Sequence, residues 1–388
     1  SLLASVMEGH GTDVGCFTAW SDMVYENGIT KFYHLDAFTD YPPGYMYILY
    51  FTAAFRKLFG IEAGSGIGVY LIKLVPIFCD LAAGYVIYKI ARKRFSQGSS
   101  LFLCGCYVLN PLVVLDSSFW CQVDSVFTLT VLLMCYLFME KKRILAYFVF
   151  AIGVLLKPQT LIFGPVLIFV IIDQVFIHEF STKKFVKDLI GGLAAVVSLF
   201  LLALPFGLEK VITQYVETLG SYEYASVNAY NFWGFLGRNW AAQDGKFLFL
   251  EYRQWGTLAI VAAVALGAWV YFKHIKDDSK YYLSSVVIVC TMFMFSVRMH
   301  ERYIYPAIVL MLVAYIVKPK KEFFYSYIAL SAVSFVNVAH VLHTFVEYET
   351  TGPNDIIVRW VAVAMMIVYG YVMIYCFSSK KEDIFPFI

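Results

Sequence analysis

The sequence predicts an all-α, polytopic membrane protein with about twelve transmembrane helices. Composition is the first reason, because 60% of the 388 residues are hydrophobic and only 15% are charged. A soluble domain needs more charged surface than this. Long apolar runs and the placement of Lys and Arg between them are the other two reasons. The net charge of +2 gives no indication of a nucleic-acid partner.

Apolar runs recur along the whole chain. A spanning helix needs about 20 apolar residues, and fewer where neighbouring helices hold its ends. The runs cover 68–88, 101–115, 125–139, 144–156, 161–176, 189–206, 255–272, 281–297, 303–317, 323–342 and 356–377. The chain opens on a short apolar segment, and we expect it to be the end of a truncated first transmembrane helix.

Lys and Arg cluster at every second connection between these runs, at 89–94, 141–143, 183–187, 273–280, 318–321 and 380–381. The positive-inside rule predicts that all of these connections face the cytoplasm. This alternation requires that Tyr45–Phe59, a short run containing Arg56 and Lys57, does not cross the membrane. We expect an interfacial or re-entrant helix there. Residues 1–388 then form one transmembrane domain, with long outer loops at 8–67 and 207–254.

The first outer loop contains a candidate general base. Asp13 begins an amphipathic stretch in which Phe17 and Trp20 share one side, and we expect that side to press on the membrane surface. A carboxylate at the boundary of water and lipid can accept a proton from an acceptor hydroxyl. Asp is also a common helix cap, so a purely structural role for Asp13 stays open.

Other polar residues lie at the outer ends of the runs, where ionisable groups tend to mark a functional cavity. Arg298, His300, Glu301 and Arg302 fall within about one helical turn, which is enough positive charge to hold a phosphate. An interfacial collar of salt bridges is the alternative for this cluster. Further candidates for the cavity are Gln122, Asp124 and Lys157. Gln122 and Asp124 could instead cap the following helix.

Several other polar or reactive residues favour structural roles. The eight Cys fall mostly inside apolar runs without ligand spacing, so we interpret them as small apolar fillers. His340 and His343 could share one helix face, but no third metal ligand is near in sequence. We expect them to be polar cavity or interface residues. Lys73 and Asp80, seven positions apart, could form an ion pair within one helix.

The order of four motifs resembles that of the GT-C glycosyltransferases, which take sugars from polyprenyl-phosphate carriers. The motifs are Asp13 in the first outer loop, D-Y-P-P-G-Y at 40–45, W-C-Q-V-D-S at 120–125 and M-H-E-R-Y at 299–303. The likeness is greatest to the bacterial family related to GPI-anchor mannosyltransferases. That family usually has W-G-Q-x-D at the third motif, so Cys121 departs from the pattern.

The resemblance implies a role for each matching residue. Asp13 matches the general base, and Asp40 and Tyr41 match a segment on the acceptor side. The positions that match donor-phosphate and sugar-binding or cavity residues are Arg298, His300, Glu301, Arg302, Lys157, Gln122 and Asp124.

The implied activity is inverting transfer of a hexose, mannose or glucose, from a polyprenyl-phosphate sugar to a glycan or lipid-linked acceptor on the extracytoplasmic face. One base opposite one phosphate leaving group fits a single in-line displacement, and cationic side chains could stabilise that phosphate without a metal cofactor. We expect a multi-pass protein of a bacterial cell membrane, with the endoplasmic reticulum as the alternative. A flippase or transporter of lipid-linked sugars is the alternative function, although no internal repeat of the kind transporters use is visible.

Overall fold

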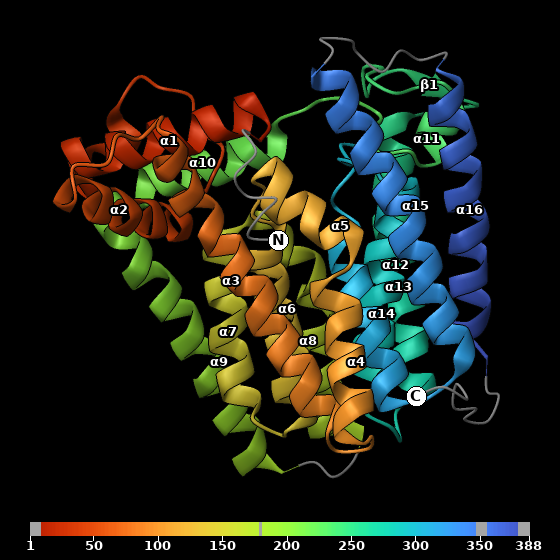
Figure 1. Ribbon diagram of the computed structural model, residues 1–388. Coiled ribbons are helices and arrows are strands. Elements are labelled where there is room, and N and C mark those ends of the chain that lie inside the picture. The colour runs from red at the N-terminus through yellow and green to blue at the C-terminus, as the bar shows by residue number, and fades with distance from the viewer. Residues whose placement is uncertain (1–8, 178–180, 347–354, 379–388) are drawn as a thin grey trace. The chain divides into compact units, whose positions relative to one another are not determined.

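The computed structural model describes residues 9–177, 181–346 and 355–378, which are mostly helical (Figure 1). The described strands are the two-residue pair β1 (Lys246–Phe247) and β2 (Leu250–Glu251), which is antiparallel. The fold class predicted from the sequence is therefore confirmed as all-α.

Each apolar run predicted from the sequence coincides with helical structure. The helices are α3 (Gly66–Ala91), α4 (Gln97–Val108) continuing into α5 (Pro111–Val114), α6 (Asp124–Met139), α7 (Arg143–Leu156), α8 (Gly164–Ile171), α9 (Thr182–Ala203), α12 (Tyr252–Lys273), α13 (Ser279–Phe295), α14 (Tyr305–Val317), α15 (Lys321–Val346) and α16 (Ile356–Cys376). A helix is the only single segment that satisfies its own backbone hydrogen bonds in lipid, which is why hydropathy locates these elements well.

The predicted number of about twelve spans is not confirmed. Among the described residues, 6 helices are long and apolar enough to cross a membrane, or up to 7 if the bent pair Gln97–Val108 and Pro111–Trp120 forms one span. Four other apolar helices, α6, α7, α13 and α14, are 10–17 residues long. The expected truncated first helix lies outside the described residues.

The chain divides into two compact units, which we describe separately. Unit 1 comprises Ser1–Leu81, Asp116–Leu161 and Glu179–Ser221. Its first loop folds into α1 (Gly11–Asn27), η2 (Ile29–His34) and α2 (Pro43–Leu58), and α10 (Leu208–Gly220) packs beside them. These helices lie across one end of α7 and α9 (Figure 1).

The expectation that α1 presses Phe17 and Trp20 on the membrane surface is wrong. Both side chains are buried in the core of unit 1. The Phe17 ring lies 5.4 Å from Tyr41 and 5.5 Å from Tyr45, centroid to centroid, so the apolar side of α1 packs on α2 instead. Sequence periodicity identifies the apolar face of a helix but not the surface that covers it.

The run Tyr45–Phe59 forms α2, which is not among the helices long and apolar enough to cross the membrane in the described part of the chain. Its Arg56 is fully buried and lies 2.6 Å from Asp22 of α1. A paired, buried Arg on a short helix agrees with the prediction that this segment does not span.

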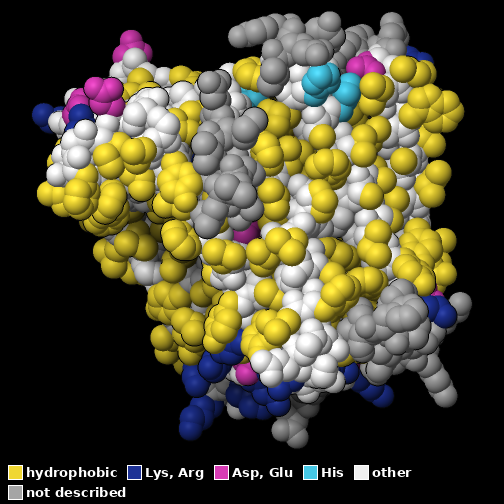
Figure 2. Space-filling view, in the orientation of Figure 1, with side chains coloured by type: hydrophobic (Ala, Val, Ile, Leu, Met, Phe, Trp, Pro, Cys, Tyr) yellow, Lys and Arg dark blue, Asp and Glu magenta, His cyan; other side chains and the backbone are white. Residues whose placement is uncertain are grey.

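Basic connections and motif residues lie at opposite ends of unit 1. The connections that precede α7 and α9 meet at one end, where Arg143 forms a bidentate pair with Asp188. Dark-blue side chains gather at the end where α9 begins, and hydrophobic side chains cover unit 1 above them (Figure 2). Lys157 follows α7 at the opposite end, beside the loop that contains Tyr41.

Unit 2 comprises Ala82–Leu115, Ile162–His178 and Tyr222–Ile388, and α12 to α16 run alongside one another within it (Figure 1). At one end the basic connections meet, since Lys318 contacts His274 and Lys320 donates to the Ser378 carbonyl. At the other end, Asn337 of α15 donates to the Asn228 carbonyl. The alternation of basic and polar ends predicted from the sequence therefore holds within unit 2 as well.

Candidate active site

The carboxylate of Asp13 is held by two aromatic nitrogens in unit 1. The indole Nε1 of Trp120 donates to Oδ2 at 2.7 Å, and Nδ1 of His10 lies 2.7 Å from the same oxygen. The Asp13 side chain is 26% exposed, so it is oriented by the protein and still reachable from outside. The hydrogen bond from Trp120 and the adjacent His10 ring together fix the direction of the Asp13 carboxylate.

His10 explains why Asp13 is not a helix cap. His10 occupies the N-cap position of α1, with its Nδ1 3.4 Å from the backbone nitrogen of Asp13. Its ring stacks on Trp120 at 5.0 Å with an interplanar angle of 17°, and its backbone nitrogen donates to the Trp120 carbonyl. The capping role left open for Asp13 is therefore wrong, because Asp13 lies in the first turn and uses its side chain elsewhere.

A buried lysine lies beside this group, and sequence reasoning gave it no part in the site. Lys73 of α3 is fully buried, and its Nζ lies 3.3 Å from the Phe119 carbonyl oxygen. Burial raises the pKa of the neighbouring Cys121 thiol to about 12, with Lys73 opposing this and Asp13 adding to it. Cys121 is thus a neutral packing residue, as its interpretation as an apolar filler predicts.

Lys157 and Asp124 form a buried ion pair, with Nζ to Oδ1 at 2.9 Å and side-chain exposures of 4% and 0%. The ammonium also lies 5.8 Å from the ring centroid of Tyr41 and 5.4 Å from that of Phe127. Asp124 is the first residue of α6, whose N-cap position is occupied by Val123 without a side-chain hydrogen bond. The alternative in which Asp124 caps α6 is therefore wrong.

Gln122 is fully buried, and both its amide oxygen and its amide nitrogen are without a hydrogen bond within the described residues. It does not cap α6. A buried amide without partners costs about 1–3 kcal/mol, and natural structures keep few such groups. This makes Gln122 a candidate for contact with a bound substrate.

The D-Y-P-P-G-Y motif places Tyr41 beside Lys157. Pro42 is the N-cap of α2 and Pro43 is its first residue, where the missing N–H of proline has no helical partner to lose. A Cβ at Gly44 would lie 2.5 Å from the Leu155 carbonyl oxygen, so a glycine lets α2 pack on the end of α7. Tyr41 precedes this contact, and Lys157 follows it.

Asp40 lies near Asp13 in the same unit. Burial first, and then the nearby carboxylates of Asp40 and Asp13, raise the pKa of the Cys16 thiol in α1. Asp40 is half-buried, and its backbone carbonyl accepts a hydrogen bond from Thr218 of α10. The structure therefore brings the predicted base and the predicted acceptor-side residues to one end of unit 1.

The predicted donor-phosphate residues lie together in unit 2. Arg302 pairs with the buried Glu301, which holds the guanidinium in a fixed direction. His300 is buried, and its ring packs edge-on against Tyr222 at a centroid distance of 4.7 Å. Arg298 donates from Nε to the side-chain oxygen of Gln243 at 3.0 Å.

These residues form a turn rather than the helical turn expected from their spacing. Arg298 has φ of 63°, and His300 forms β-bridges with Val227 and Asn228 before α14 begins at Tyr305. The salt bridge between Arg302 and Glu301 is what the interfacial collar would also contain. The backbone β-bridges that hold the buried His300 are not needed for a collar.

The two histidines of α15 differ in surroundings. His340 Nδ1 lies 2.5 Å from the Tyr230 hydroxyl, and its Nε2 lies 3.8 Å from Asp355. His343 is exposed. No group of three His, Cys, Asp or Glu side chains suited to a metal ion occurs in the described part of the chain. His340 is thus a polar contact residue of unit 2, in agreement with the interpretation from the sequence.

The structure therefore presents the predicted residues as two groups. Asp13, Asp40, Tyr41, Gln122, Asp124 and Lys157 belong to unit 1, and Arg298, His300, Glu301 and Arg302 belong to unit 2. Sequence reasoning missed His10 and Lys73 as neighbours of Asp13. The position of His10 three residues before Asp13 was the available signal, because an N-cap side chain and the third helical residue face each other.

Comparison with known proteins adds one family match. Residues 40–205 match the family model described as dolichyl-phosphate-mannose-protein mannosyltransferase. No curated protein sequence matches the chain. Among solved structures, the crystal structure of ArnT from Cupriavidus metallidurans in the apo state is similar, with 14% identity, 97% of this chain and 74% of that chain covered, and a TM-score of 0.44. The family match includes Asp40, Gln122 and Lys157 and ends before Arg298, His300, Glu301 and Arg302.

Proposed function

We propose that the chain is a GT-C glycosyltransferase that transfers a hexose, mannose or glucose, from a polyprenyl-phosphate donor to an acceptor hydroxyl with inversion. The family description names dolichyl-phosphate-mannose, which is a sugar on a polyprenyl phosphate. This supports the donor class. The narrower likeness to the GPI-anchor mannosyltransferase relatives stays a prediction, as does the acceptor, a glycan or a lipid-linked sugar.

The oriented carboxylate of Asp13 is the observation that carries the proposal. Trp120 and His10 both lie 2.7 Å from Oδ2 of Asp13, and the side chain keeps partial exposure. In the proposed reaction Asp13 takes the proton of the acceptor hydroxyl while the acceptor oxygen bonds to the anomeric carbon. The bond from that carbon to the phosphate oxygen breaks, and the polyprenyl phosphate leaves with the electron pair. One displacement inverts the anomeric configuration.

The cationic residues of unit 2 are proposed to bind the phosphate of the donor. Arg302 can offer a charge-assisted contact to a phosphate oxygen, with Glu301 fixing its direction. His300 is held beside it by Tyr222 and can donate a further hydrogen bond. Charge of this kind can stabilise a phosphate leaving group, and independence from metal remains part of the proposal.

We propose that the Asp13 end of unit 1 faces outward. The basic residues at the beginning of α9 would then face the cytoplasm, in line with the positive-inside rule. The acceptor would approach from the extracytoplasmic side, in a bacterial cell membrane or, as the alternative, in the endoplasmic reticulum.

Turnover of purified Asp13→Asn tests the proposal, with polyprenyl-phosphate mannose and glucose as donors. Loss of a general base should lower turnover by about 10²–10⁴, while thermal stability and donor binding stay close to wild type. Asp36→Asn is the matched control, because Asp36 is an exposed acid of the same loop. It should keep full turnover.

A stable Asp13→Asn enzyme that retains more than about a tenth of wild-type turnover would exclude Asp13 as the base. Asp40 would then be the next candidate. If the wild-type protein moves the lipid-linked sugar across a vesicle membrane and forms no new glycosidic bond, the flippase alternative is correct.

A further inference from the structure

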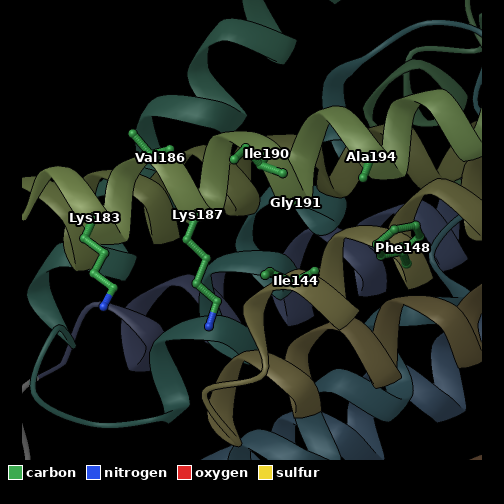
Figure 3. A pocket seen from close by; sticks show the side chains of 8 residues that line it. All are labelled: Ile144, Phe148, Lys183, Val186, Lys187, Ile190, Gly191 and Ala194. Carbon is green, nitrogen blue, oxygen red and sulfur yellow. The ribbon is translucent and has the colours of Figure 1, made fainter.

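A hollow of about 390 Å³ opens between α7 and α9 in unit 1 (Figure 3). Ile144 and Phe148 of α7 line one side. From α9 come apolar residues, among them Val186, Ile190 and Ala194. The hollow lies at the end where both helices begin, which is the basic end of the unit.

Glycine at position 191 gives the hollow its floor. A Cβ at Gly191 would lie 2.8 Å from Cγ1 of Ile144, so the α9 backbone lies directly against α7 at this point. Val186 and Ile190, which precede Gly191 along α9, are 43% and 61% exposed. Exposed apolar side chains of α9 and partly buried ones of α7 thus line an apolar groove.

Two lysines stand at the open end of this groove. Lys183 and Lys187 are one helical turn apart, line the hollow, and extend from the same side of α9 (Figure 3). Both are exposed, and neither forms a salt bridge with a described residue. Arg143 is different, because Asp188 holds its guanidinium at 3.0 Å and 2.9 Å. Within the described part of unit 1, the two lysines therefore give the open end of the groove its positive charge.

We propose that this groove binds an anionic phospholipid of the adjoining leaflet. Its phosphate would contact Lys183 and Lys187, and one acyl chain would lie along Ile144, Phe148 and Ile190. Charge complementarity favours an anionic headgroup over a zwitterionic one, whose cationic group would meet the lysines. The apolar walls favour a lipid over soluble phosphate. This inference uses none of the residues assigned to catalysis.

Native mass spectrometry of the full chain in detergent tests the inference, with phosphatidylglycerol and phosphatidylcholine of equal chain length as probes. Wild type should bind phosphatidylglycerol more tightly. Lys183→Gln and Lys187→Gln should each weaken that binding about five-fold. Lys184→Gln is the matched control, since Lys184 has the same charge on the same helix and does not line the groove. The Lys184→Gln variant should change the affinity for phosphatidylglycerol less than about two-fold, because an exposed charge outside the groove contributes little.

Filling the groove tests the acyl-chain part. Ala194→Phe should reduce binding of phosphatidylglycerol, and Val197→Phe, an exposed position of α9 outside the groove, should not. Equal losses for Lys184→Gln and Lys183→Gln would overturn the inference in favour of diffuse surface attraction. It would also be overturned if inorganic phosphate displaced the lipid at equal concentration, or if Ala194→Phe altered only the oligomeric state, because a second copy would then cover the groove.

Discussion

Replacing Lys157 by Met should destabilise the protein strongly, because it leaves the carboxylate of Asp124 buried without its partner. The two side chains are 4% and 0% exposed and lie 2.9 Å apart. Removal of one member of a buried pair costs about 3–5 kcal/mol, whereas an exposed pair would cost about 0–1 kcal/mol. Met keeps the length and apolar stem of Lys, so packing against Tyr41 and Phe127 changes little.

The double variant Lys157→Met with Asp124→Leu separates structure from function. An apolar pair of similar volume is often as stable as the ion pair it replaces. Thermal unfolding of the purified proteins should therefore show a large loss in the single variant and recovery in the double variant. Turnover should stay low in both if Lys157 lines the substrate cavity. A single variant as stable as wild type would refute the reasoning, and full turnover in the double variant would give Lys157 a structural role only.

The remaining predictions concern three other positions. Trp120→Phe removes the indole N–H donor and keeps an aromatic ring. The activation free energy should rise by about 1.5–3 kcal/mol, the contribution of a charge-assisted hydrogen bond, and turnover should fall accordingly, with thermal stability nearly unchanged. Gly44→Ala places a methyl group 2.5 Å from the Leu155 carbonyl and should lower stability by about 1–3 kcal/mol. Gly64→Ala, in open space, should not. Arg302→Ala should weaken donor binding by about 1.5–3 kcal/mol in an equilibrium assay, and unchanged affinity would favour the collar interpretation.

The positions of the helices could be predicted because each apolar segment must satisfy its own backbone hydrogen bonds in lipid, whatever lies beside it. A run such as 189–206 must satisfy its own backbone hydrogen bonds wherever it lies, and its residues 189–203 form part of α9. The number of spans could not be predicted in this way. α7 has 14 residues and α14 has 13, and whether helices of this length cross the membrane depends on what holds their ends.

The residue types of the candidate site could be predicted, but their partners could not. Asp124 and Lys157 are 33 positions apart, and Asp13 and Trp120 are 107 positions apart. No local rule relates residues at such separations, so capping was the natural alternative for both acids. The structure rejects it for both, because each carboxylate is occupied by a distant donor.

Cys121 shows how a departure from the family pattern can be understood once the backbone is known. Its φ is 76°, in the left-handed region that glycine adopts without penalty and other residues enter at a cost of about 1–2 kcal/mol. The glycine usual in the W-G-Q-x-D motif is therefore explained by the turn between Trp120 and α6, which brings the indole to Asp13. In this chain the Cys121 side chain is buried, and burial of its apolar surface opposes the cost of this backbone conformation. The motif thus specifies a backbone conformation first, and the identity of this residue can vary as long as that turn is kept.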